Sequence, residues 1–192
     1  MSAPVFYYDT NSPYAYLAAN RVDDLLPDAT WHPIAFGIVL RELGRVPWSL
    51  GPGRAEGMAE IERRAAERGL PPVRWPEGWP VDTYSLAPLR ALEFADERGS
   101  QRELARALYR QNFEAGASLA EVDNVLRAAA EVGLDPDEVR GALDDDRVKD
   151  RLRAHTDEAM GLGVIGVPTV VVDGTVFWGD DHLEDAAAAA GG

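Results

Sequence analysis

The chain has 192 residues, enough for one domain with a full hydrophobic core or for one domain that carries a large insertion. Its 33 acidic residues exceed its 19 basic residues and give a formal net charge of −14. Such an acidic balance argues against nucleic acid or an anionic membrane as a partner. The absence of cysteine excludes disulfides, thiolate metal sites and cysteine nucleophiles.

Targeting and metal-binding signals are also missing from the sequence. Residues 1–4 run directly into a strand-like segment, without a basic stretch or an apolar signal core, and no apolar run is long enough to span a bilayer. The three histidines, His32, His155 and His182, are too far apart to suggest a metal cluster. We therefore expect a cytoplasmic protein without a metal, in which His155 is a solvated residue on a charged helix.

The first forty residues predict a strand, a helix and a second strand. The run Val-Phe-Tyr-Tyr at residues 5–8 is typical of a buried strand. Ser12 before Pro13 has the form of a helix N-cap followed by proline at the first helical position, and a helix is predicted over 14–26. Residues 31–36 are predicted to form a second strand, parallel to the first across that helix.

From about residue 37 to residue 160 the pattern becomes helical. Two serines, Ser100 and Ser118, each stand three residues before a glutamate and predict capping boxes, and Asp135 before a proline predicts a third helix start. The segments 47–53 and 71–80 are rich in tryptophan and proline and are predicted to be loops. Two interpretations of these loops stay open: they line a pocket, or they form a packed strap on the surface.

The C-terminal part predicts a β-hairpin and a last helix. Residues 169–172 and 175–178 read as strands joined by the two-residue turn Asp173-Gly174, and residues 179–181 lead into an alanine-rich helix. The order βαβ, helical block, ββα is that of an α/β thioredoxin fold interrupted by an all-helical insertion. We expect residues 1–40 and 158–192 to form the thioredoxin-like domain, and 41–157 to form the insertion.

In thioredoxin-like proteins a Cys-x-x-Cys motif opens the first helix, and a loop with a cis-proline precedes the third strand. Here Ser12-Pro13-Tyr14-Ala15 occupies the first place, and Val167-Pro168 is the candidate cis bond. Disulfide oxidoreduction of the DsbA type, which shares this fold, is excluded as an activity because it needs two thiols.

Both ends of the sequence resemble the 2-hydroxychromene-2-carboxylate isomerases and the kappa-class glutathione transferases. The resemblance covers roughly residues 5–44 and 158–185, and its motifs are Tyr7-Tyr8-Asp9, Ser12-Pro13-Tyr14-Ala15-Tyr16-Leu17, Pro33-Ile34-Ala35-Phe36-Gly37, Gly166-Val167-Pro168-Thr169 and Phe177-Trp178-Gly179-Asp180-Asp181-His182-Leu183. It implies a homodimer that binds glutathione and acts on an aromatic or conjugated electrophile.

The resemblance also implies a role for each matching residue. The sulfur of glutathione would meet Ser12, and main-chain groups at Val167, before Pro168, would pair with the cysteinyl part. Asp181, with Asp180 adjacent, would meet the γ-glutamyl part; the alternative is that Asp181 only caps the last helix. In the isomerase, the activated thiol is thought to add to a conjugated double bond, permit rotation and leave.

Elementary energetics support a serine in this role. A thiol with a pKa of about 8.5 is only a few per cent thiolate at neutral pH, and lowering that pKa by two units takes about 2.7 kcal/mol. A helix N-terminus supplies up to roughly 2 kcal/mol, and a hydroxyl that donates to an anion adds about 1.5–3 kcal/mol. The two together suffice.

The sequence departs from the family around the acceptor site. The family places a lysine and an aromatic residue after the second strand, whereas here Arg54 is the nearest cation and Gly57 stands near the aromatic position. His182 replaces an arginine. An acceptor pocket is still predicted, and its residues would be Tyr14, Trp48, Arg54, Trp75 and Trp79. The alternatives are a thiol-binding module without catalysis and a thiol other than glutathione.

Overall fold

A computed structural model describes residues 3–191 and contains a mixed sheet of four strands. The strands are β1 (Val5–Tyr8), β2 (Thr30–Pro33), β3 (Thr169–Val172) and β4 (Thr175–Trp178), in the order β2-β1-β3-β4. β1 pairs with β2 in parallel and with β3 antiparallel, and β4 closes the hairpin with β3. The predicted first, third and fourth strands are confirmed. The second ends earlier than predicted, because Phe36 already begins a helix.

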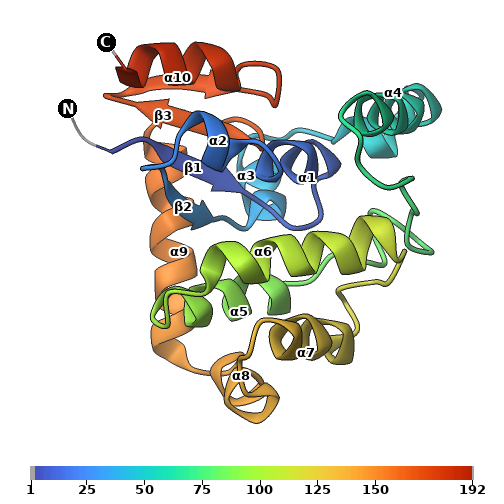
Figure 1. Ribbon diagram of the computed structural model, residues 1–192, viewed down its shortest axis with the longest axis vertical. Coiled ribbons are helices and arrows are strands. Elements are labelled where there is room, and N and C mark those ends of the chain that lie inside the picture. The colour runs from blue at the N-terminus through green and yellow to red at the C-terminus, as the bar shows by residue number, and fades with distance from the viewer. Residues whose placement is uncertain (1–2, 192) are drawn as a thin grey trace.

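The alternation of side chains along β1 divides the core between the two faces of the sheet. Phe6 and Tyr8 point to a large core that includes α1 (Pro13–Ala19) and α10 (Leu183–Gly191). Tyr7 points to the other face, where Ile34 and Val39 form a smaller core with α9 (Asp146–Gly161). Helices therefore cover both faces, as Figure 1 shows.

The single helix predicted over 14–26 is interrupted. α1 ends at Ala19, and the short α2 (Val22–Leu25) follows. The amide of Asn20 donates from Nδ2 to the carbonyl oxygen of Tyr16 at 2.8 Å, which satisfies a carbonyl at the end of α1. Asn20 is the C-cap residue, so the chain leaves the helix there.

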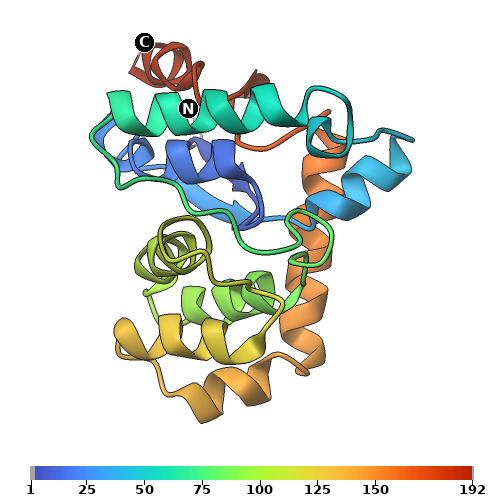
Figure 2. The same ribbon diagram turned by 90° about the vertical axis from the view of Figure 1, so that its right-hand side faces the viewer.

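The middle of the chain forms a helical block beneath the sheet (Figure 2). Its helices are α5 (Ala87–Asp96), α6 (Gln101–Tyr109), α7 (Val122–Glu131) and α8 (Pro136–Ala142), with a π-helical segment at Arg110–Glu114 after α6. α3 (Phe36–Glu42), a 3₁₀ turn at Trp48–Leu50 and α4 (Arg54–Glu67) precede this block. α4 contacts α1, so part of the sequence segment assigned to the insertion lies on the thioredoxin side.

The predicted helix starts have mixed outcomes. Asp135 caps α8 through a bond from the Asp137 N–H, as expected. Ser100 precedes α6, but its side chain makes no capping bond. Ser118 does not begin a helix: its Oγ accepts from the Ala120 N–H at 3.2 Å, and α7 starts only at Val122.

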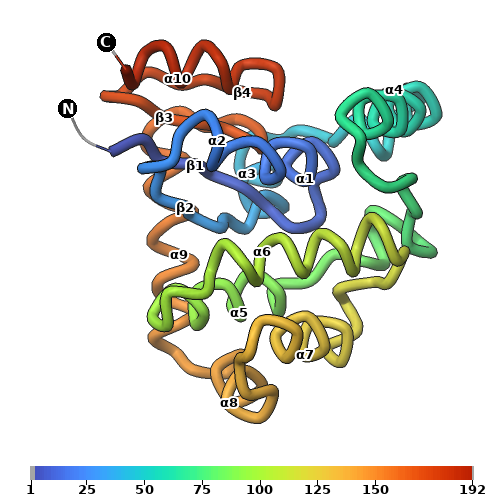
Figure 3. Tube along the Cα trace, in the orientation of Figure 1, coloured from blue at the N-terminus to red at the C-terminus, as the bar shows by residue number. Residues whose placement is uncertain are grey.

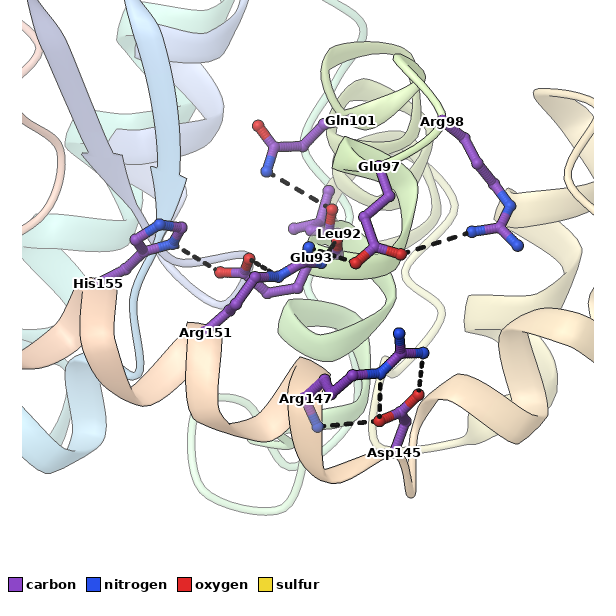
Figure 4. Close-up of polar contacts among 9 residues, drawn as sticks. All are labelled: Leu92, Glu93, Glu97, Arg98, Gln101, Asp145, Arg147, Arg151 and His155. Atoms are coloured by element: carbon purple, nitrogen blue, oxygen red, sulfur yellow. Dashed lines mark hydrogen bonds and ion pairs between the residues drawn. The ribbon is translucent and has the colours of Figure 1, made fainter.

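A buried polar contact joins α5 to α9 (Figure 4). Nδ1 of His155 lies 2.8 Å from Oε1 of Glu93, whose side chain is fully buried, and Arg151 approaches the other carboxylate oxygen at 3.4 Å. The ring of His155 also stacks on His32 of β2, with centroids 3.8 Å apart. The expectation that His155 is a solvated surface residue is therefore wrong.

The N-terminal end of β1 and the C-terminal end of α10 lie on the same side of the molecule (Figure 3). Among residues 3–191, no helix combines the length and the apolar character needed to cross a membrane.

Candidate active site

Ser12 lies where the first strand passes into the first helix. It is the N-cap of α1, and its Oγ accepts the Ala15 N–H at 3.2 Å, as the sequence predicted. The hydroxyl donates to the carbonyl oxygen of Val167, also at 3.2 Å. The Val167–Pro168 bond is cis. One hydrogen bond thus joins the motif at the start of the first helix to the cis-proline loop, 155 residues later in the sequence.

The turn before Ser12 is built around Asp9, which is only 2% exposed. Its Oδ1 accepts the Asn11 N–H at 2.8 Å and its Oδ2 accepts the Phe36 N–H at 3.0 Å. The main-chain carbonyl of Asp9 accepts the Ser12 N–H. Burial raises the pKa of the Asp9 carboxyl to about 6, although its hydrogen-bond donors act in the opposite direction. Sequence reasoning gave Asp9 no role; its place directly after a buried strand and before Ser12 is the signal that points to it.

Asn11 attaches this turn to the loop that precedes α5. Its Nδ2 donates to the Pro80 carbonyl at 2.9 Å, and its Oδ1 accepts the Thr83 hydroxyl at 3.0 Å. Its own carbonyl accepts the Trp79 indole N–H at 3.2 Å. Trp79–Pro80 is a second cis bond. The Ser12 turn is thus held by two loops, each of which contains a cis-proline.

The aromatic residues predicted for the acceptor pocket lie together beside Ser12. The ring of Trp48 meets Tyr14 at 5.9 Å and Trp79 at 5.7 Å between centroids, and Trp75 meets Trp79 at 4.6 Å. Trp48 also covers Gly57, where an added Cβ would lie 2.3 Å from the indole. Trp79 is buried, so only Tyr14, Trp48 and Trp75 keep exposed surface for a ligand.

Arg54 belongs to the same cluster but is already engaged. Its guanidinium donates to the carbonyls of Ser49 at 3.0 Å and of Trp79 at 2.6 Å, and it lies over the Trp79 ring. Arg54 therefore fixes the two loops to each other.

The two adjacent aspartates after β4 differ in their surroundings. Asp180 is 1% exposed and pairs with Arg64 at 2.8 Å and with Arg68 at 2.5 Å. Asp181 is exposed on the same loop. Asp180 therefore anchors α4 and the residue after it to the loop that follows β4, and Asp181 is the one of the two that is open to a ligand. α10 begins two residues after Asp181.

The N-terminus of α1 carries a partial positive charge beside Ser12. The guanidinium of Arg64 lies 5.8 Å from the centroid of the Tyr14 ring, but it is already paired with Glu60 and Asp180. Burial raises the pKa of the Tyr14 phenol, so it keeps its proton at neutral pH. The helix end therefore favours an anion near Ser12.

The fold and this site define a class of protein. The family model of the DSBA-like thioredoxin domain matches residues 5–190, and the chain belongs to that family. Having no cysteine, it lacks the two thiols that disulfide exchange requires.

Similarity to particular proteins is consistent with this assignment and with the predicted fold. The chain is 26% identical over 186 residues to the 2-hydroxychromene-2-carboxylate isomerase of Sphingobium xenophagum, with 93% of each covered. A solved structure of 2-hydroxychromene-2-carboxylate isomerase superposes with a TM-score of 0.84 at 20% identity, over 98% of this chain and 94% of that one. A probable DsbA oxidoreductase from Streptomyces coelicolor superposes with a TM-score of 0.74 at 24% identity, over 97% and 88%. The predicted resemblance to the isomerases is thus confirmed.

Proposed function

We propose that this protein is a glutathione-dependent isomerase or transferase that acts on an aromatic or conjugated electrophile. The observation that carries the proposal is the position of the Ser12 hydroxyl, at the N-terminus of α1 and against the carbonyl before cis-Pro168. The 26% sequence identity to a 2-hydroxychromene-2-carboxylate isomerase, which extends over 93% of both chains, supports the isomerase reaction.

The donor set around Ser12 fits a thiolate. One lone pair of the hydroxyl oxygen accepts the Ala15 N–H, and the hydroxyl proton points at the Val167 carbonyl. Rotation about Cβ–Oγ would redirect this hydrogen bond from the neutral carbonyl to an anionic sulfur, which is the stronger acceptor, and the proton would stay on Oγ. The partial positive charge of the helix end acts on the same atom.

Further residues would serve the remaining parts of glutathione. Exposed Asp181 would accept the ammonium of the γ-glutamyl group, whereas Asp180 is occupied by two arginines. The main chain at Val167 borders the place for the cysteinyl part. Bound glutathione would supply the chemistry of reversible thiolate addition to a conjugated double bond, which would permit rotation about that bond.

Residues of the aromatic cluster would orient the acceptor. Tyr14, Trp48 and Trp75 keep partly exposed rings next to the Ser12 turn, and flat apolar faces suit a planar aromatic substrate. The Tyr14 phenol stays protonated and would act as a hydrogen-bond donor there.

The test has two stages. Calorimetric titration of the protein with glutathione should give saturable binding, and 2-hydroxychromene-2-carboxylate should then isomerise only when protein and glutathione are both present. S-methylglutathione is the matched control: it should bind but should not support turnover. Absence of glutathione binding would refute the proposal.

A second candidate is a thiol-binding protein without isomerase activity. The observation that favours it is Arg54, the nearest cation to the family's lysine position, which is committed to two main-chain carbonyls. Saturable binding of glutathione without turnover of any conjugated acceptor would select this candidate.

A further inference from the structure

Asp9 is a buried carboxyl at the active site that none of the steps above uses. Three donors converge on it: the Asn11 N–H, the Phe36 N–H and the hydroxyl of Tyr84. The Tyr84 oxygen in turn accepts the Gly37 N–H at 3.0 Å, so its own proton is left for Asp9. The carboxyl therefore ties the turn before Ser12 to the start of α3.

The Asp9 carboxyl has no cationic partner within residues 3–191. Among the described residues, no arginine, lysine or histidine forms an ion pair with Asp9. The titratable groups that face it are phenols: Tyr84 on the carboxyl itself, and Tyr109 of α6, whose hydroxyl donates to the Asp9 main-chain carbonyl at 3.1 Å. Burial raises the pKa of both phenols, so both are neutral donors at any ordinary pH.

The ionised carboxyl suits this arrangement and the protonated carboxyl does not. An ionised carboxylate is acceptor-only and offers two equivalent oxygens. A proton on either oxygen turns it into a donor and weakens its bonds with the N–H and O–H groups that already point at it. Because burial raises the pKa of Asp9 to about 6, this change falls within the range where proteins stay folded.

Movement of the Asp9 carboxyl would be transmitted directly to the site. Asn11 N–H bonds to the carboxyl, Ser12 N–H bonds to the Asp9 carbonyl, and the Asn11 carbonyl holds the Trp79 indole. These contacts involve the turn of residues 9–12, whose last residue carries the Ser12 hydroxyl.

We propose that Asp9 is a positioning residue that holds the turn of residues 9–12 in its thiol-binding geometry only while its carboxyl is ionised, so that acid turns thiol binding off. The proposal rests on the thiol-binding function of Ser12 proposed above. It adds a pH-sensitive element to that site.

The first experiment needs no ligand. The indole N–H of Trp79, assigned by comparison with Trp79→Phe, reports the Asn11 carbonyl by NMR. Its resonance should titrate with a midpoint near pH 6 in the wild type and should not move in Asp9→Asn. In Tyr84→Phe the midpoint should rise, because loss of the phenol removes a donor that favours the ionised form. Asp123→Asn, at an 85% exposed side chain, is the matched control and should titrate like the wild type.

The second experiment measures binding of S-methylglutathione, which has no ionisable sulfur. Binding to the wild type should be about tenfold weaker at about pH 5 than at about pH 7, because only about a tenth of the Asp9 carboxyls are then ionised. In Asp9→Asn the two affinities should agree within about twofold, and in Tyr84→Phe the loss should begin at a higher pH.

The outcomes separate the two proposals. A Trp79 signal that does not titrate in the wild type, or that titrates equally in Asp9→Asn, overturns the role of Asp9. A decrease of affinity in acid that persists in Asp9→Asn belongs to another group and overturns it as well. If the Trp79 signal behaves as expected but neither glutathione nor S-methylglutathione binds, the conformational role of Asp9 stands and the thiol-binding function fails.

Discussion

Replacement of Ser12 by alanine is the most direct test of how this site acts on a thiol. The hydroxyl makes two bonds of equal length, one from Ala15 N–H and one to the Val167 carbonyl. Loss of the N-cap bond should reduce the free energy of unfolding by about 1 kcal/mol. This effect on stability is separate from the effect on the thiol.

The effect on a bound thiol follows from an exchange of hydrogen bonds. Donation to a thiolate contributes about 1.5–3 kcal/mol, but the hydroxyl must first give up its bond to the Val167 carbonyl, which contributes about 0.5–1.5 kcal/mol. The middle of each range leaves a net preference for the thiolate of about 1.3 kcal/mol, which corresponds to one pKa unit. Ser12→Ala should raise the pKa of the bound thiol by about that amount.

The assay is a pH titration of the ultraviolet thiolate absorbance of protein-bound glutathione. Ser12→Thr is the matched control, because threonine keeps the hydroxyl and is also a good N-cap; its bound thiol should titrate as in the wild type. An alanine variant that binds glutathione with an unchanged thiol pKa would refute the role of Ser12, and the helix terminus alone would then account for any thiolate.

Three further predictions concern the frame of the site. Gly166→Ala places a Cβ 2.2 Å from Nε1 of Trp178, so we expect a loss of about 1–3 kcal/mol in urea unfolding; Gly161→Ala, with no atom within 4 Å, is the control and should cause no loss. Asp180→Asn breaks both ion pairs to the arginines on and after α4, and urea unfolding should show a loss of about 1–3 kcal/mol, less than for a fully buried pair since the arginines are 22–23% exposed. A stability equal to that of the wild type would show that α4 is held by its apolar contacts alone. Burial and the neighbouring histidine lower the pKa of His32. The contribution of His32 to folding stability is therefore fully present above the ordinary histidine pKa of about 6.5 and declines as the pH falls below it. The urea midpoint should decline less in acid for His32→Gln than for the wild type, and equal slopes would contradict this.

Elements whose cause is local could be predicted from the sequence. The hairpin of β3 and β4 is set by Asp173 and Gly174, which adopt φ of 44° and 82°, as a tight hairpin turn requires. The start of α1 is set in the same way by Ser12, which caps the helix, and by Pro13, its first residue. The cis bond before Pro168 was predicted from a short sequence motif and not from hydrophobic periodicity.

Features that depend on distant partners could not be predicted in this way. The partner of His155 is Glu93, 62 residues earlier on another helix, and no periodicity of α9 indicates it. Asp180 and Asp181 are identical in type and adjacent in sequence, and only the approach of α4 decides which of them is paired. The three donors on Asp9 come from three separate segments.

The order of the strands has a consequence for how the protein is made. The central strands β1 and β3 pair Val5 with Val171, so the middle of the sheet closes only when nearly the whole chain is available. Contacts of such wide sequence separation slow folding, while the helices between them can form from local contacts. During synthesis, one edge of β1 has no strand to pair with until β3 emerges, and unpaired edges favour aggregation. A chain that stops before residue 167 also lacks the carbonyl that Ser12 contacts, so no N-terminal fragment carries a complete site.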